Sequence, residues 1–217
     1  MELQQEPKPK IKPVIRLKPK IWKPITHDYH GREIEAHKHL TNFECCIDID
    51  EVVHLRNKTR KKELKQTLDS CGYLRFEPHQ GERTPIQVHR LVALLWKENP
   101  DNKPCVDHIN HKDKLNNKLS NLRWCTKSEN GMNRGLFSNN TSGESCIYEI
   151  FSRGYPYWEV QVKAKSKGKP LKKRFKRTSN VIPAEVIAWR DEAKKKHQGE
   201  FACIIPRPPS SESSAEP

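Results

Sequence analysis

The sequence predicts an α+β protein made of several small units, each with short strands and a helix. Only 34% of the 217 residues are hydrophobic and 31% are charged, so any core is modest and divided. Short runs of β-branched and aromatic residues alternate with Gly-, Pro- and Asn-bearing turns, which is typical of strands. Two longer stretches, starting at Val88 and Pro183, instead repeat apolar residues at helical spacing.

The chain is strongly basic, with 41 Lys+Arg against 27 Asp+Glu and a formal net charge of +14. This excess predicts a polyanionic partner, nucleic acid first and an anionic membrane surface second. A merely soluble basic protein is the alternative. No run of 18 apolar residues occurs, so neither a transmembrane helix nor a membrane partner is expected. The N-terminus lacks the apolar core of a secretion signal.

The cysteines predict a reducing, intracellular location, without distinguishing nucleoid, nucleus or organelle. There are seven, in no C-x-x-C pair and at no regular spacing: Cys45, Cys46, Cys71, Cys105, Cys125, Cys146 and Cys203. An odd, irregular set argues against a disulfide framework and against a four-cysteine zinc site. No structural zinc is therefore expected.

Composition divides the chain into six segments. They are a Pro/Lys-rich basic arm (1–25), a β-rich module (26–77), a helix with a polar hairpin (78–135), a Gly/Asn/Ser linker (136–145), a second mixed unit (146–205) and a disordered tail (206–217). Five prolines block helix and internal sheet in the arm, so we expect it to be extended. It could bind phosphates, with RNA as one candidate, or be a solvated leader.

The elements follow from local patterns. In the β-rich module, "CCIDID", "VVHLRN" and "GYLRFEP" predict strands. Val88, Leu91, Val92 and Leu95 form one helical stripe, which Asn99-Pro100 ends. In the second unit, "SCIYEIF", "YWEVQVKAK" and "LKKRFKR" predict three strands. A helix follows, with Pro183 at its start and Gly199 past its end, and it should cover Trp158 on one sheet face.

The most polar stretch is "CVDHINHKDKLNNKLSNLRWCTKSEN", residues 105–130. Thr126 and Glu129 fit a helix capping box, and Val106 would end a strand with Asp107 and His108 at its mouth. The result is a β-loop-β-helix hairpin in which an Asp and an Asn oxygen face each other. Such hard ligands suit Mg²⁺, and a neutral His beside them could take a proton from water, as phosphodiester hydrolysis requires. The alternative is a loop whose Asx side chains cap their own backbone.

The stretch "VHRLVALLW…VDHIN…LNN…SNLRWCTKSEN" resembles the HNH nucleases of phage and mobile-intron homing endonucleases, in the His-Me finger group. The resemblance covers residues 88–135 and implies a ββα-metal hairpin. It implies two catalytic residues, with His108 the general base and Asn121 holding the loop and orienting that histidine. Asp107 and Asn130 would be ligands of Mg²⁺ or another divalent cation. His111-Lys112 replaces the usual Gly region of the loop, and Asn116 stands where Asp is common.

Two further resemblances flank this segment. Through "ECCIDIDEVVHLRNKT" and "CGYLRF", residues 40–77 are similar to a nuclease-associated module. Through "TSGESCIYEI", "YWEVQV" and "HQGEFA", residues 142–205 resemble the Apetala-type DNA-binding domain, whose three-stranded antiparallel sheet enters the major groove. Eight residues could then face bases or phosphates: Arg153, Glu159, Gln161, Lys163, Lys172, Lys173, Arg174 and Arg177.

The resemblances imply a Mg²⁺-dependent homing-type DNA endonuclease that cuts with the hairpin and chooses its site in double-stranded DNA with the C-terminal sheet. Monomer and homodimer both remain open. The alternative is a non-catalytic nucleic-acid-binding protein derived from an HNH nuclease, acting in a large nucleoprotein assembly such as a ribosome. If the chain is such an endonuclease, deleting residues 142–217 should remove the sheet and leave the hairpin whole.

Overall fold

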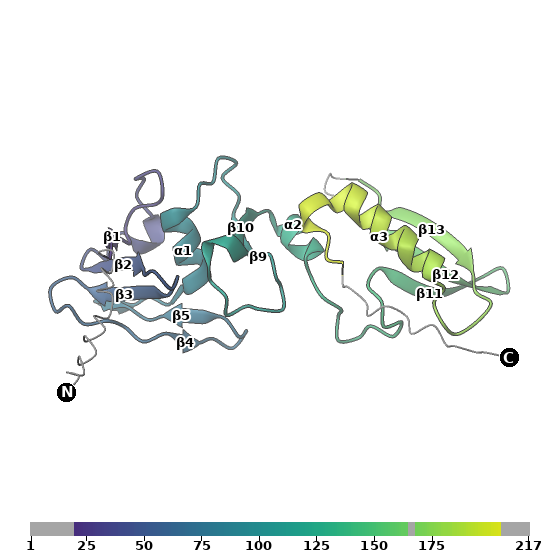
Figure 1. Ribbon diagram of the computed structural model, residues 1–217, viewed down its shortest axis with the longest axis horizontal. Coiled ribbons are helices and arrows are strands. Elements are labelled where there is room, and N and C mark those ends of the chain that lie inside the picture. Colours follow the sequence, from purple (N-terminus) through teal and green to yellow (C-terminus); the bar gives the residue numbers. More distant parts are fainter. Residues whose placement is uncertain (1–19, 165–167, 205–217) are drawn as a thin grey trace, which may run out of the picture.

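The computed structural model describes residues 20–164 and 168–204, which form an elongated arrangement of small antiparallel sheets and few helices (Figure 1). This confirms the predicted mixed α and β class. Most of the basic arm, the middle of the basic run 163–177 and the tail lie outside the described residues. None of the described helices combines the length and apolarity needed to cross a bilayer.

The first sheet has the order β1-β2-β3, with the 3₁₀ turn η1 between its first two strands. Their bounds are β1 Lys23–Pro24, η1 Glu35–His37, β2 Phe43–Ile47 and β3 Val53–Asn57. Phe43 and Cys45 point into the core and pair across to β3. The prolines of the arm were expected to block helix and internal sheet, and Pro24 accordingly pairs with Glu44 in an edge strand. An edge position tolerates a proline, because no neighbour needs its missing N–H.

A second small sheet, a hairpin and the first helix complete the N-terminal part. Their bounds are β4 Thr67–Leu68, β5 Leu74–Phe76, β6 His79–Gln80, β7 Glu82–Arg83, β8 Ile86–Gln87 and α1 Val88–Trp96. The sheet order is β4-β5-β8. The predicted stripe of α1 is correct, because Val88, Leu91, Val92 and Leu95 are all buried in the largest core cluster. Leu122 of the following hairpin belongs to the same cluster, so α1 anchors that hairpin.

The hairpin consists of β9 Cys105–His108, η2 Leu119–Asn121, β10 Leu122–Cys125 and α2 Lys127–Met132. The strands are antiparallel, with Asp107 opposite Arg123 and His108 opposite Leu122. The first strand therefore runs two residues beyond its predicted end at Val106, because Asp107 and His108 have pairing partners. The capping box is confirmed: the Thr126 hydroxyl accepts from the Glu129 N–H, and the Glu129 carboxylate accepts from the Thr126 N–H.

The C-terminal unit is a sheet in the order β11-β12-β13, covered on one face by a long helix (Figure 1). Its elements are β11 Ile147–Ser152, β12 Tyr155–Val162, β13 Leu171–Lys176, α3 Ala184–Gln198 and η3 Gly199–Phe201. As predicted, Trp158 is buried with Val186 of α3. At the end of α3 the chain turns into η3, and Phe201 packs with Cys125 and Met132 of the hairpin.

Candidate active site

Asp107 and His108 lie side by side at the end of β9, where α1, β10 and α2 converge. Both are 5% exposed, and both line a cavity of about 490 Å³. Successive side chains of a strand point to opposite sides. Accordingly, His108 contacts Tyr73 and His89, whereas Asp107 contacts Arg123 and residues after α2. The hairpin thus presents an acid and an imidazole from one strand end to one cavity.

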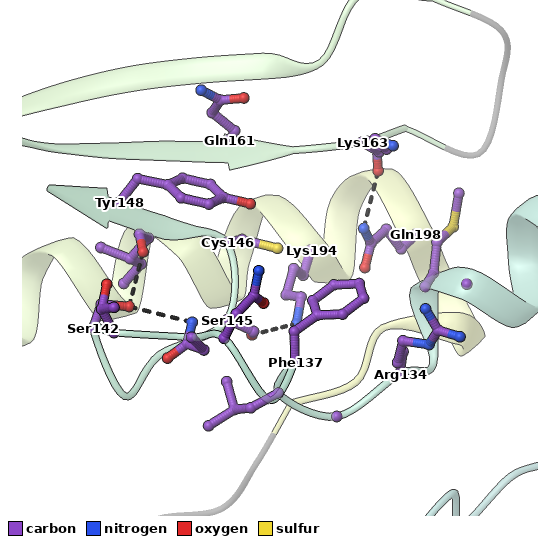
Figure 2. A pocket seen from close by; sticks show the side chains of 18 of the residues that line it. Arg134, Phe137, Ser142, Ser145, Cys146, Tyr148, Gln161, Lys163, Lys194 and Gln198 are labelled. Carbon is purple, nitrogen blue, oxygen red and sulfur yellow. Dashed lines mark hydrogen bonds between the residues drawn. The ribbon is translucent and has the colours of Figure 1, made fainter. Parts of the chain in front are cut away.

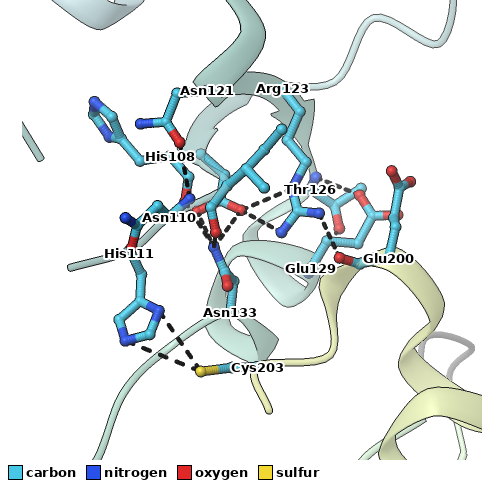
Figure 3. A network of polar contacts seen from close by, with 12 residues as sticks. His108, Asn110, His111, Asn121, Arg123, Thr126, Glu129, Asn133, Glu200 and Cys203 are labelled. Carbon is cyan, nitrogen blue, oxygen red and sulfur yellow. Dashed lines mark hydrogen bonds and ion pairs between the residues drawn. The ribbon is translucent and has the colours of Figure 1, made fainter. Parts of the chain in front are cut away.

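The Asp107 carboxylate is held by Arg123 and by Asn133, whose side chains are labelled in Figure 3. Arg123 donates to Oδ2 from Nε at 2.9 Å and from Nη2 at 2.8 Å. Asn133 Nδ2 lies 2.9 Å from Oδ2 and 3.1 Å from Oδ1. A buried carboxylate needs such partners, because an isolated charge is strongly disfavoured away from water. The direction of the carboxylate is therefore fixed before any ligand binds.

Asn133 faces more acceptors than it can satisfy. Besides both Asp107 oxygens, its Nδ2 lies 2.7 Å from the His108 carbonyl oxygen and 3.2 Å from that of Ile109. An amide NH₂ carries only two hydrogens. Four oxygens therefore converge on one amide that offers two hydrogens. The sequence interpretation did not single out Asn133; its spacing of three from Asn130, one helical turn, was the available signal.

His108 is held by a hydrogen bond and by ring contacts. Its Nε2 lies 3.1 Å from Asn117 Oδ1, and Asn117 Nδ2 donates to the Leu115 carbonyl at 3.2 Å. Because this places the amide oxygen toward the ring, the hydrogen must be on Nε2, which leaves Nδ1 as the basic nitrogen. Tyr73 stacks on the imidazole with centroids 5.8 Å apart. Burial lowers the pKa of His108 despite the Asn117 contact, so the ring is kept neutral.

His89 is a second buried imidazole beside the first. The two ring centroids are 5.0 Å apart, and the same distance separates His89 from Tyr73. Burial, with a smaller contribution from the nearby His108, lowers the pKa of His89 to about 4. Within the described ranges, its Nδ1 has no hydrogen-bond partner. The structural role expected from its place beside the helix stripe is consistent with this packing.

Asn121 pins the loop of the hairpin. Its Oδ1 accepts from the Asn110 N–H at 2.9 Å, and its Nδ2 donates to the Asn116 carbonyl at 2.8 Å. Its own carbonyl accepts from the Ile109 N–H at 2.7 Å. These bonds join the two ends of the loop, while the bond to the imidazole comes from Asn117. A role of Asn121 in orienting His108 is therefore indirect, through the loop, and stays a prediction.

Asn130 lies on α2, is exposed, and lines the same cavity as Asp107 and His108. One carboxylate and one amide oxygen at a water-accessible cavity match the ligands of Mg²⁺, which keeps several waters and takes further ligands from phosphate. No group of three His, Cys, Asp or Glu suited to a metal occurs in the described part of the chain. The residues present thus fit a hydrated divalent cation better than a closed metal cage.

The predicted DNA contacts of the C-terminal unit divide between two faces of its sheet. Lys172 and Arg174 share the outer face with Glu159 and Gln161. Glu159 accepts from Arg174 Nε at 2.8 Å and from the Gln161 amide. The Arg174 hydrogen bond lowers the pKa of Glu159. Arg153 lies in the exposed turn before β12. Glu159 is buried beneath these side chains, whereas Lys172, Arg174 and Arg153 are exposed and could be reached by a nucleic acid.

Two of the predicted contacts lie elsewhere. Lys173 Nζ sits over the rings of Phe175 and Trp189, 4.9 Å and 5.3 Å from their centroids, on the helix side of the sheet. Arg177 lies over Trp158 and pairs with Glu149. Both cations therefore have partners within the protein, and the outer face does not include them.

A second cavity, of about 700 Å³, connects this unit to the hairpin. Figure 2 shows Arg134 and Phe137 on one side of it and Gln161 and Lys163 on another. The Lys163 carbonyl accepts from Gln198 at the end of α3. Both cavities share four lining residues: Lys127, Gly131, Arg134 and Gly135. The two cavities therefore adjoin along α2 and the start of the linker.

Comparisons with known proteins agree with this site. Residues 87–132 match the family model described as HNH endonuclease. Two uncharacterized HNH endonucleases of Acanthamoeba polyphaga mimivirus are 41% and 54% identical over 75 and 81 residues, or 34% and 36% of this chain and 22% and 20% of theirs. DNA endonuclease I-HmuI of Bacillus phage SP01 is 40% identical over 81 residues, 36% of this chain and 46% of its own.

The chain thus spans less than half the length of each of these curated relatives. A solved structure, described as DNA binding and cleavage by the HNH homing endonuclease I-HmuI, aligns with a TM-score of 0.36 and 20% identity, covering 73% of this chain and 79% of that one. The family match, residues 87–132, includes Asp107 and His108. Residues 87–132 therefore match the HNH endonuclease family, and the chain is homologous over 81 residues to the phage endonuclease I-HmuI.

Proposed function

We propose that the chain is a divalent-cation-dependent DNA endonuclease of the homing type, which uses Mg²⁺ and hydrolyses phosphodiester bonds. One observation carries the proposal: Asp107, His108 and Asn130 line one cavity, with His108 held so that Nδ1 is its basic nitrogen. The match to an HNH endonuclease family over the same residues supports it. The net charge of +14 supports a polyanionic substrate.

In this proposal the roles divide among the site residues. His108 takes a proton at Nδ1 from the attacking water, while Asn117 Oδ1 accepts a hydrogen bond from Nε2–H and keeps the ring in that tautomer. Asp107 and Asn130 hold the cation. When bound, a divalent cation stabilises the charge that develops on the phosphate and on the departing oxygen. Asn121 keeps the loop closed behind His108.

We further propose that the outer face of β11–β13 chooses the DNA site. Contacts to phosphate set affinity and register, while contacts to base edges set the choice of sequence. Gln161 and Arg174 are candidates for base edges, and Lys172 for phosphate. The two adjoining cavities would let one DNA molecule reach both the hairpin and the sheet. One HNH centre in a monomer would nick one strand; cutting both strands together would require a homodimer.

Supercoiled plasmid incubated with the purified chain tests the proposal. We expect Mg²⁺-dependent conversion to the nicked form, which EDTA abolishes. His108→Ala should lower the rate by about 10²–10⁴-fold while binding of linear duplex stays unchanged, because a general base acts on water and not on affinity. His79→Ala, at an exposed histidine that does not line the cavity, is the control.

The outcomes separate nuclease from binder. Equal nicking by the wild type and His108→Ala would remove the assigned base. Tight DNA or RNA binding by a wild type that never nicks, with Mg²⁺ or Mn²⁺, would support the non-catalytic alternative.

A further inference from the structure

We propose that Glu200 and Phe201, in the last described turn of the C-terminal unit, are positioning residues of the nuclease centre. They hold Arg123, and Arg123 holds Asp107. The physical coupling is independent of catalysis, whereas its effect on cleavage rests on the proposed function. Nothing in the HNH match includes these residues, which lie some 70 positions beyond its end at 132.

Arg123 is held from three sides, and Figure 3 shows its contact with Glu200. Its Nε and Nη2 donate to Asp107, and its Nη1 donates to the Glu200 carbonyl at 2.5 Å. The Phe201 ring covers the guanidinium face, 3.9 Å from ring centroid to Cζ. A planar guanidinium has five donors in a rigid fork and stacks on aromatic rings, so these contacts together fix its plane and its direction. The side of Arg123 away from Asp107 is thus built by the C-terminal unit.

The turn after α3 delivers this segment to the hairpin. Gly199 ends the helix with φ +57° and ψ −131°, a region that is essentially restricted to glycine. Phe201 then inserts between Cys125 and Met132 and is 1% exposed. Lys194 of α3 donates to the Cys203 carbonyl at 2.6 Å, which ties the segment back to its own helix. The position of Phe201 therefore follows the position of α3.

This packing corrects one expectation from the sequence. Deletion of residues 142–217 was expected to leave the hairpin whole, but it would remove both the Glu200 carbonyl and the Phe201 ring. Arg123 would keep its charge, and Asp107 would remain its partner in a strand pair. The guanidinium would lose the contacts that hold its plane, and Asp107 would lose its fixed support. Groups that support a metal ligand in this way usually change metal affinity or activity by about 10–100-fold when removed.

The test compares two phenylalanines of the C-terminal unit. Phe201→Leu removes the ring over Arg123 and keeps an apolar side chain; Phe201→Tyr keeps the ring. Phe175→Leu is the matched control, because Phe175 packs on Trp189 under α3. Mn²⁺ binding by electron paramagnetic resonance should weaken about tenfold or more in Phe201→Leu and recover in Phe201→Tyr. Single-turnover nicking should fall similarly, with duplex affinity unchanged.

A third measurement needs neither cation nor cleavage. The Arg123 Nε hydrogen should be protected from solvent exchange in the wild type and in Phe175→Leu, and lose protection in Phe201→Leu. Unchanged protection of the Arg123 Nε hydrogen in folded Phe201→Leu would overturn the coupling. If the wild type binds Mn²⁺, an equal Mn²⁺ affinity in Phe201→Leu would overturn it as well. A wild type that never nicks would overturn only the proposed function, because the exchange measurement still decides the coupling.

A second variant covers the case in which Phe201→Leu fails to fold. In Gly199→Ala the added Cβ meets no atom within 4 Å, so only the backbone angle is strained and the η3 segment shifts. Loss of Arg123 protection is expected there as well. Retained protection in folded Gly199→Ala, with η3 displaced as judged by its amide shifts, would contradict the coupling.

Discussion

The HNH hairpin and the C-terminal sheet each hold a buried carboxylate paired with an arginine, but the two arginines differ in exposure. In the hairpin, Asp107 and Arg123 are 5% and 8% exposed, and their contact is 2.8 Å. In the sheet, Arg174 contacts Glu159 over the same 2.8 Å, yet its side chain is 54% exposed. Buried groups with fixed directions need no reorganisation when charge develops, whereas exposed cations can exchange protein partners for a ligand. The two regions therefore suit chemistry and recognition, respectively.

The largest expected effect comes from removing one arginine from each region. Arg123→Met should lower the free energy of unfolding by about 3–5 kcal/mol, because it leaves the Asp107 carboxylate buried with only Asn133. Arg174→Met should change it by about 1 kcal/mol or less, since Gln161 and Lys172 still contact Glu159. Urea denaturation of both variants measures this. Equal losses of unfolding free energy in the two variants would contradict the comparison, because the burial of Arg123 would then add nothing to its contribution to stability.

His89 makes the hairpin side sensitive to acid. Its pKa is about 4 in the folded chain and 6.5 when unperturbed. Between these values the unfolded chain binds a proton that the folded chain does not, so stability is full above about pH 6.5 and falls toward pH 4 by roughly 3 kcal/mol. His89→Leu should flatten the corresponding part of a denaturation series across pH.

Three other histidines contribute to the slope that remains in the His89→Leu series. Burial also lowers the pKa values of His37, His108 and His111. A stability profile across pH that is identical in the wild type and His89→Leu would show that folding does not lower the pKa of His89.

The helices α2 and α3, which follow the strands of these two regions, differ in their capping. Thr126 caps α2 through its hydroxyl, whereas Pro183 at the start of α3 makes no side-chain cap bond. Thr126→Ala should therefore cost about 1 kcal/mol of unfolding free energy. Pro183→Ala removes no capping bond, so its cost should be smaller. Thermal unfolding of the two variants under one condition checks the order, and a larger loss for Pro183→Ala would reverse it.

The smallest effect should separate adjacent residues of β13. Lys172 is on the outer face and Lys173 lies over Phe175 and Trp189. Lys172→Gln should reduce the slope of log affinity for duplex DNA against log salt by about 0.9, the value for one phosphate contact. Lys173→Gln should leave the slope unchanged. A salt titration in which both variants change it equally would mean that DNA contacts both faces.

What the sequence could and could not predict follows the range of the interactions. The α1 stripe, the Thr126 capping box and the bounds of α3 were predicted correctly, because each depends on residues a few positions apart. Asp107 and His108 were singled out from a motif in which the two residues are adjacent. The contact of Arg123 with the Glu200 carbonyl spans 77 positions, and no local pattern encodes it.

Intermediate distances were predicted in part. Asn121 was expected to hold the loop, and its bonds to Asn110 and Asn116 lie within that loop. The bond from Asn117 to the imidazole was missed, since five asparagines crowd the segment and only loop closure decides which one meets the ring. The split between Lys172 and Lys173 could have been found from strand alternation alone, because neighbours in a strand face opposite sides.

Asp107 and His108 are held in part by residues outside the matched segment, and this affects how a nuclease of this kind could be moved from one gene to another. A cassette cut at the bounds of the matched segment, 87–132, would leave behind Asn133, Tyr73 and Phe201. The cassette would carry Asp107, His108 and the loop between the strands. It would lack the Asn133 amide that contacts Asp107, the Phe201 ring that covers Arg123 and the Tyr73 ring that stacks on His108. Recombination that preserves activity in a new host protein would then favour breakpoints before Tyr73 and after Phe201, or a recipient that supplies equivalent rings of its own.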